Sequence, residues 1–296
     1  MSQKGLQVLI LGELTVLANG SHLGVPGSRK TRALLAYLLL QNRPVTREHL
    51  CELLWPHPDN PRAALRWSLS KLRPLLNGHT QHLVTDRNSV VIKGLEECVD
   101  LRQVDNLLRK PIDSIATADL VAAAELFHGE LLEGMEIPDC HRFNEWLIAR
   151  SEAARKSRRT ILEALTTRLA DDPEQALIHA RSRVALNPLD EAAHVDVVRI
   201  LGTLGRRVEA QNQADRCVEI LDQEMGVTPG PELGQALREM KNTATPEPVF
   251  MRTPVSVKPL GTAEAGLFGR AEECIRLESF LDMDGPRPVL FFEGEP

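Results

Sequence analysis

The first 25 residues of the chain contain short apolar runs that are rich in β-forming residues, a pattern that is typical of β-strands. Gln7–Leu11 and Leu14–Leu17 are the apolar-rich runs, and the Asn19-Gly20 pair that follows them is a strong hairpin signal. A third strand is expected near His22–Val25. The chain is therefore predicted to begin with a small antiparallel sheet.

After Ser28 the apolar residues recur with the spacing of a helix. Ser28 and Thr46 are suited to cap two successive helices, because a hydroxyl accepts a hydrogen bond from a free backbone N–H of the first turn. Each helix has one apolar stripe. The residues expected to be buried are Ala33, Leu34, Leu35, Leu38 and Leu39 in the first helix and Leu50, Leu53 and Leu54 in the second.

A third, longer helix is predicted over residues 62–76, after a loop at residues 55–61 whose three prolines prevent a helix there. The leucines of this helix recur at i, i+4, i+7 and i+11, so they lie on one face. Two strands, His82–Thr85 and Val90–Ile92, then form a predicted hairpin. The order of elements is thus a sheet, two helices, a loop, a long helix and a hairpin.

The face of the third helix that points away from its leucines is rich in cations. A helix about 10–12 Å across enters the major groove of DNA, where bases are read by hydrogen bonds and phosphates are bound by cations. We therefore expect this helix and the tip of the following hairpin to contact DNA. The candidate DNA-binding residues are Arg62, Arg66, Trp67, Ser70, Lys71, Arg73, Arg87 and Asn88.

Two alternatives remain open for this helix. The same pattern describes a solvated helix of an α+β domain that binds no ligand. Trp67 lies opposite the leucine stripe, and we expect its ring either to touch thymine methyl groups or sugars in the groove, or to pack on a neighbouring helix or subunit.

After residue 100 the composition becomes helical and rich in Ala, Leu, Arg and Glu. Residues 174–176 with Ala180 recur as residues 208–210 with Ala214, a shift of 34 residues. That period is typical of tetratricopeptide repeats, in which pairs of helices stack into an array. We expect a mainly α fold, in which an N-terminal α+β winged helix-turn-helix precedes an all-α tetratricopeptide-like domain.

Charge is divided unevenly along the chain. Residues 1–100 hold 12 Lys and Arg against 8 Asp and Glu, whereas the remaining residues hold 23 against 33. This balance favours phosphate binding by the N-terminal part. The five cysteines are scattered without a CxxC pair, and no apolar run reaches the ~18–20 residues needed to cross a bilayer. We expect a cytoplasmic protein with reduced thiols, no metal and no membrane contact, and the sequence has no G-x-S-x-G or H-E-x-x-H motif that would indicate an enzyme.

Residues 32–40, 46–55 and 69–76 resemble the OmpR/PhoB-type winged helix of the SARP regulators, a group named for antibiotic regulatory proteins. The region behind them resembles the bacterial transcriptional activation domain of the same family. Its marks are Asp100-Leu101, Phe127–Leu132, Asn187–Glu191 and Leu221–Leu233. The resemblance extends in unbroken order to about residue 241.

This resemblance implies a sequence-specific transcription activator that binds direct repeats in promoter DNA, as two protomers side by side, and recruits RNA polymerase. It also implies a polymerase-contact loop, which here comprises Trp55, His57, Asp59 and Asn60. The hairpin departs from the family pattern, because Asn88-Ser89 stands where a Gly-Tyr pair is common. No receiver domain is expected before the winged helix, so no phosphorylated aspartate would switch it.

Near the C-terminus, Phe268-Gly269-Arg270-Ala271-Glu272 and the expected strand that ends in Gly294-Glu295-Pro296 resemble the beginning of a STAND-type P-loop ATPase. A Walker A loop needs GxxxxGK[ST], and only Gly294 could begin that motif, so we expect no bound ATP and no cofactor. The expected divisions are residues 1–98 for the winged helix, 99–241 for the activation domain, 242–262 for a linker and 263–296 for a truncated ATPase domain. The alternative functions are a tetratricopeptide-type scaffold for protein interactions and the N-terminal fragment of an ATP-dependent signalling regulator.

Overall fold

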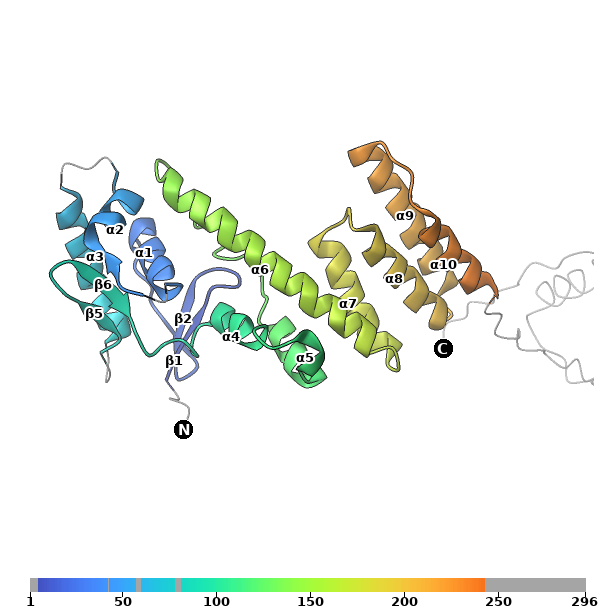
Figure 1. Cartoon of the computed structure of the whole chain (residues 1–296), viewed down its shortest axis with the longest axis horizontal. Coiled ribbons are helices and arrows are strands. Elements are labelled where there is room, and N and C mark those ends of the chain that lie inside the picture. Colours follow the sequence, from blue (N-terminus) through green and yellow to red (C-terminus); the bar gives the residue numbers. More distant parts are fainter. Residues whose placement is uncertain (1–4, 42, 57–59, 78–80, 243–296) are drawn as a thin grey trace, which may run out of the picture. The chain divides into compact units, whose positions relative to one another are not determined.

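The structure is a computed structural model that describes residues 5–41, 43–56, 60–77 and 81–242. The described residues belong to one compact unit, and residues 246–296 lie outside the described residues. The expected linker, apart from its first residue, and the expected ATPase domain also lie outside them. The described chain is mostly helical, with ten α-helices and two small sheets (Figure 1). None of the described helices has the length and apolar character needed to span a membrane.

The first sheet contains β1 (Leu6–Leu9), β2 (Thr15–Ala18) and β3 (Ser21–Leu23) in that order, all antiparallel. Asn19 and Gly20 both have positive φ, which is the geometry that a two-residue hairpin turn requires. One detail of the prediction is wrong: β1 ends at Leu9 rather than continuing to residue 11.

The next two helices begin at the caps that the sequence predicts. Ser28 caps α1 (Arg29–Leu39), and its Oγ accepts a hydrogen bond from the N–H of Thr31. Thr46 caps α2 (Arg47–Leu54) in the same way, with the N–H of His49 as donor. All the residues expected to be buried in these two helices are buried.

The long helix α3 (Pro61–Leu76) packs against α1, α2 and β5 (Leu83–Thr85). The hairpin partner of β5 is β6 (Ser89–Ile92), as predicted. A short strand that was not predicted, β4 (Val45–Thr46), pairs with β6, so the second sheet has the order β4-β6-β5. This pairing ties the start of α2 to the hairpin.

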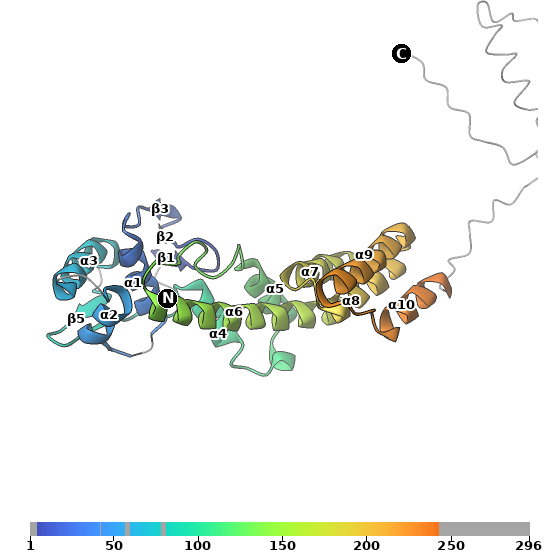
Figure 2. The same cartoon turned by 90° about the horizontal axis from the view of Figure 1, so that it is seen from above.

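The hairpin leads into α4 (Asp100–Leu107), a short 3₁₀ turn at Ile112–Ser114, and α5 (Thr117–Glu125). The long helix α6 (His141–Arg168) follows, and it packs in turn on α2, α4, α5 and α7 (Pro173–Leu186). Figures 1 and 2 both show α6 running from beside α2 to α7. One helix therefore contacts both the N-terminal elements and the C-terminal helices.

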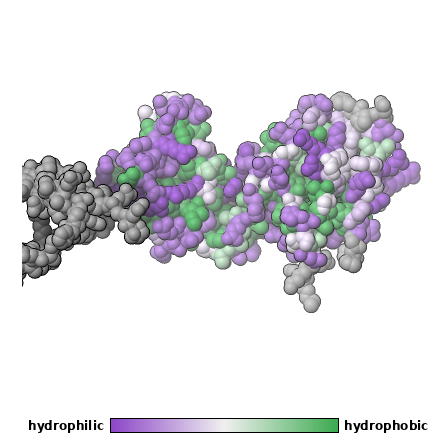
Figure 3. Space-filling view, turned by 180° about the vertical axis from the view of Figure 1, so that it is seen from behind, coloured by the Kyte–Doolittle hydropathy of each residue, from purple (hydrophilic) through white to green (hydrophobic). Residues whose placement is uncertain are grey.

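The chain continues with α8 (Glu191–Thr203), α9 (Arg207–Met225) and α10 (Pro231–Asn242). The repeated alanines occupy equivalent places, because Ala176 and Ala180 are buried in α7, and Ala210 and Ala214 are buried in α9. Small side chains at these four positions let neighbouring helices approach closely. The face drawn in Figure 3 mixes hydrophobic residues among hydrophilic ones.

The hydrophobic core does not divide at residue 98. One cluster of buried apolar side chains extends from Val8 to Leu165 and so includes α4, α5 and most of α6. A second cluster begins at Leu177 and ends at Met240. The first part of the expected activation domain is therefore packed into the same core as the expected winged helix.

Candidate nucleic-acid interface

The helix α3 exposes cationic side chains, while its cap and its buried leucines hold it in place. Asn60 caps it through Oδ1, which accepts from the N–H of Ala63 at 2.9 Å, and Pro61 occupies the first helical position. The leucine stripe is buried as predicted. The exposed surface of the helix carries four cations, with Arg66 and Lys71 away from the leucines and Arg62 and Arg73 on the flank, and residues 61–76 contain no acidic side chain. All six residues proposed from this helix are exposed, namely Arg62, Arg66, Trp67, Ser70, Lys71 and Arg73.

A buried polar contact that the sequence did not reveal fixes α3 against α1. The hydroxyl groups of Thr31 and Ser68 lie 3.0 Å apart, and both residues are buried. Each hydroxyl satisfies the other inside the core, because an unpaired buried hydroxyl would be costly. The rotation of α3 about its own axis is thereby set by a hydrogen bond as well as by the leucines.

Trp67 and Lys71 form a pair on the exposed face. The Nζ atom of Lys71 lies 5.5 Å from the centroid of the Trp67 ring, one helical turn away, which is cation–π geometry. The Trp67 side chain is nevertheless 52% exposed. The Ser70 hydroxyl donates to the Trp67 carbonyl at 2.6 Å, so its donor is used within the helix while its oxygen can still accept.

Arg62 and Arg66 take part in none of the ion pairs of the described residues. Arg73 differs from them, because its Nη2 donates to the Thr85 hydroxyl of β5 at 3.1 Å. Arg73 therefore links α3 to the hairpin. Its remaining N–H groups can still bind a phosphate, since a guanidinium group has five donors.

The hairpin loop places Arg87 and Asn88 at an exposed tip, as predicted. The Asp86 carboxylate accepts hydrogen bonds from the N–H groups of Asn88 and Ser89 and from the Ser89 hydroxyl. These bonds favour the ionised form and hold the pKa of Asp86 below its ordinary value, with the Ser89 hydroxyl as the main cause. The loop therefore has a defined shape before any ligand arrives.

Arg47, the first residue of α2, was not among the predicted site residues. Its Nε donates to the Asp86 carbonyl at 3.0 Å, and its backbone N–H donates to the Asn88 carbonyl at 2.8 Å. It thus fixes the hairpin tip beside the start of α2. Its basic side chain, half-buried in the structure, was the only signal in the sequence, because its partners lie about forty residues away.

The expected polymerase-contact loop is described only at its ends. His57 and Asp59 lie outside the described residues. Trp55 is described, and its side chain is only 7% exposed because it packs in the hydrophobic core. Trp55 therefore anchors the start of the loop, and the polymerase contact expected of this loop stays a prediction. Asn60 is exposed, but its side-chain oxygen is used to cap α3.

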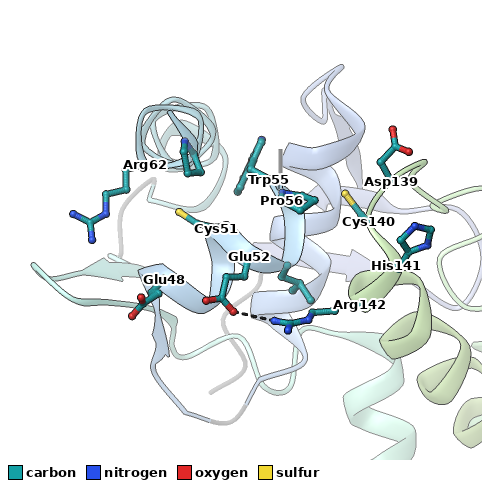
Figure 4. A pocket seen from close by; sticks show the side chains of 12 residues that line it. Glu48, Cys51, Glu52, Trp55, Pro56, Arg62, Asp139, Cys140, His141 and Arg142 are labelled. Carbon is teal, nitrogen blue, oxygen red and sulfur yellow. Dashed lines mark hydrogen bonds and ion pairs between the residues drawn. The ribbon is translucent and has the colours of Figure 1, made fainter. Parts of the chain in front are cut away.

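A cavity of about 700 Å³ opens beside the described ends of this loop (Figure 4). It lies between α2 and the start of α6, which an ion pair of 2.9 Å between Glu52 and Arg142 joins. Burial raises the pKa of both of its thiols, Cys51 and Cys140, which disfavours the reactive thiolate. No group of metal-ligating side chains occurs within the described residues.

The interface is tied to the rest of the unit through residues 10–12. The Asp100 carboxylate, 1% exposed, accepts from the N–H groups of Ile10 and Leu11 at 2.8 and 2.9 Å. The backbone N–H groups of residues 128, 129, 132 and 133 donate in turn to the carbonyls of residues 10–12. These bonds end β1 at Leu9, because the next peptide groups bond to α4 and to the segment before α6.

Comparison with known proteins yields one family match. Residues 95–241 match the model of the bacterial transcriptional activator domain. The match begins four residues before the expected boundary at 99 and includes Asp100. It covers α4 to α10 but not α1 to α3.

Two similar proteins extend the likeness towards the N-terminus. The regulatory protein AfsR of Streptomyces griseus is 27% identical over 249 residues, which are 78% of this chain and 24% of AfsR. The chain thus spans about a quarter of the length of this relative. A solved structure of Mycobacterium tuberculosis EmbR, in complex with a low affinity phosphopeptide, has a TM-score of 0.60 at 22% identity, over 81% of this chain and 66% of that chain. The likeness to EmbR indicates the fold alone.

Proposed function

We propose that this chain, a transcription regulator of the SARP kind, binds double-stranded promoter DNA in a sequence-specific manner with α3 in the major groove. The observation that carries the proposal is the asymmetry of α3. One face is buried through leucines and the Thr31–Ser68 contact, and the exposed remainder of the helix carries four cations and no acid. A surface of this kind attracts phosphates and offers donors to base edges.

In this proposal residues 1–98 act as a winged helix-turn-helix. Helix α2 precedes the recognition helix α3, and the β5–β6 hairpin is the wing. Arg66, Ser70 and Lys71 face the bases, while Arg62 and Arg73 face phosphates. Arg87 and Asn88 contact the backbone or minor groove from the wing, whose shape Asp86 and Arg47 maintain. A preformed wing binds with a smaller loss of conformational entropy.

Residues 99–241 act as the activation domain, in which α6 to α10 form tetratricopeptide-like helix pairs. The family match points to a regulator that is not an enzyme. We place the RNA polymerase contact at the connection between α2 and α3, through His57, Asp59 and the backbone near Asn60, and not through the buried Trp55 ring. Two copies of the chain would occupy direct repeats side by side.

The proposal is tested by selecting bound duplexes from genomic fragments of a SARP-containing bacterium. The selection is run with the wild-type chain and with the Arg66→Ala/Lys71→Ala variant, at low and at physiological salt. We expect the wild type to enrich a repeated motif and the variant to enrich none. Arg216→Ala is the matched control, because it removes an exposed arginine from α9. No enrichment by the wild type at either salt concentration would contradict the proposal.

A second function, binding of an extended peptide, is favoured by a groove along α8. Two hollows of about 190 and 340 Å³ share Asp196 and Arg199, and residues from α6, α7 and α10 line their sides. This groove and the exposed face of α3 use different residues, so the scaffold function and DNA binding are compatible. Arg199→Ala is expected to leave DNA affinity unchanged.

A further inference from the structure

Trp67 stands apart from the other exposed apolar side chains of the described residues. The remaining large ones belong to α6 and to elements that follow it, whereas Trp67 lies on the cationic face of α3. An exposed indole on a polar face leaves a large apolar area in water, and tryptophan is enriched at binding interfaces. The neighbouring Arg66 and Lys71 indicate that the partner is an anionic polymer.

The major groove of DNA offers few apolar groups to such a ring. The C5 methyl group of thymine is the apolar group that a base edge projects there, whereas guanine projects the acceptors N7 and O6. Lys71 is held 5.5 Å from the ring centroid of Trp67, so an apolar surface and an ammonium donor lie side by side. Stacked base pairs are about 3.4 Å apart, so the two groups can reach neighbouring pairs.

We propose that Trp67 and Lys71 act together as a specificity-determining pair, in which the indole packs on a thymine methyl group and the ammonium group donates to an adjacent guanine. This inference rests on the proposed function, because it requires α3 to lie in the groove. It names the base step that the helix reads. The ring also positions the lysine, which would otherwise be a flexible side chain.

The experiment uses a duplex that the wild-type chain has enriched from a random library. Each thymine is replaced singly by deoxyuridine, which removes the methyl group and keeps the pairing. Each guanine is replaced singly by 7-deazaguanine, which removes the N7 acceptor. We expect one thymine at which deoxyuridine weakens wild-type binding by about fourfold, the loss for exposing one methyl group. One guanine beside it should be sensitive to the loss of N7.

Variants assign the two effects. With Trp67→Ala, replacing that thymine by deoxyuridine should no longer weaken binding, while base replacements elsewhere in the duplex should weaken it as before. Trp67→Phe should restore part of the deoxyuridine effect. With Lys71→Met, replacing the adjacent guanine by 7-deazaguanine should no longer weaken binding. Far-ultraviolet circular dichroism and thermal unfolding verify that the variants fold, which the exposure of both side chains favours.

The inference is overturned if Trp67→Ala keeps the deoxyuridine penalty, or if no thymine in the duplex is sensitive. It is also overturned if Trp67→Ala binds a single half-site with unchanged affinity and loses only cooperativity on two sites, since Trp67 would then contact a second subunit. In each of these cases specific binding by the wild type still stands. Failure of the wild type to enrich any motif is the distinct result that would contradict the proposed function.

Discussion

The buried carboxylate of Asp100 accepts a hydrogen bond of 2.8 Å from the backbone N–H of Ile10, ninety residues earlier in the chain. The same carboxylate binds the N–H groups of Leu11 and of its own neighbour Leu101. The first turn of α4 is thereby bonded to the end of β1. The proposed DNA-binding part and the matched activator domain are joined at this point by polar contacts inside a shared core.

Asp100→Asn is expected to destabilise the unit. The amide NH₂ of asparagine is a donor, and one of its two positions must face a backbone N–H that needs an acceptor. The free energy of unfolding should fall by about 2–3 kcal/mol, the scale of hydrogen bonds to a charged group. Urea unfolding followed by circular dichroism measures it. Asp171→Asn, in an exposed turn, is the control, and equal effects of the two substitutions would refute the role of Asp100.

Gly129→Ala is expected to destabilise the contact between residues 10–12 and the segment before α6. A Cβ at residue 129 would lie 3.2 Å from the Cα of Gly12, a backbone atom that cannot move without disturbing residues 10–12. We expect a loss of about 1–3 kcal/mol in thermal or urea unfolding, as for other overpacked sites. Gly27→Ala, where a Cβ meets nothing within 4 Å, should cost much less. A neutral Gly129→Ala would show that the two backbones are not in close contact.

The hairpin tip should depend on pH through Asp86. Since its folded pKa lies below the ordinary value, ionised Asp86 favours the ordered loop at all pH values above that ordinary value. The contribution is lost as the pH falls through the lowered pKa. Ser89→Ala removes the main cause, so an NMR titration of the Asp86 carboxyl should show a higher pKa in this variant. An unchanged pKa would contradict the hydrogen-bonded loop.

Arg183→Met is expected to destabilise the C-terminal helices. Arg183 is 6% exposed and pairs with Asp190 and Asp196 at 3.2 and 2.7 Å. Without it two half-buried carboxylates lose their partner, and the free energy of unfolding should fall by about 3–5 kcal/mol at pH 7. Arg181→Met is the matched control, because its ion pair with Glu209 is half exposed and should contribute about 1 kcal/mol or less.

The loss of unfolding free energy caused by Arg183→Met should be smaller at low pH. Burial already raises the pKa of Asp196, and Arg183 opposes that rise. Removing the arginine raises the folded pKa further, so the folded variant binds a proton more tightly than the unfolded chain does. Its stability should therefore recover as the pH is lowered from 7 towards 4, as urea unfolding at several pH values would show. A deficit that is constant over this range would contradict the account.

Features that depend on neighbours in sequence were predictable. The caps Ser28 and Thr46, the leucine stripe of α3 and the Asn19-Gly20 turn each follow from local rules of helix capping, helix periodicity and turn geometry. The exposed face of α3 follows from the same periodicity. For this reason the proposed site residues on that helix could be named without a structure.

Features that depend on distant partners were not predictable. The role of Asp100 requires Ile10, and that of Arg47 requires Asp86. The sequence marked Asp100, and the segment that contains Arg47, only through a family resemblance. The burial of Trp55 was not predictable for a related reason, because residues far along the chain complete the core in which its ring is buried. The contacts of Asp100 and Arg47 and the burial of Trp55 all depend on tertiary packing, which a local sequence pattern does not contain.

The central claim is that α3 binds DNA through its cationic face. The measurement that tests it most directly is the dissociation constant for an enriched duplex, obtained by fluorescence anisotropy at several salt concentrations. It compares the wild type, Arg66→Ala/Lys71→Ala and the control Arg216→Ala. We predict that the double variant binds at least about tenfold more weakly, or with a shallower salt dependence wherever a phosphate contact is lost, while Arg216→Ala matches the wild type. Equal affinity and equal salt dependence for all three proteins would contradict the account.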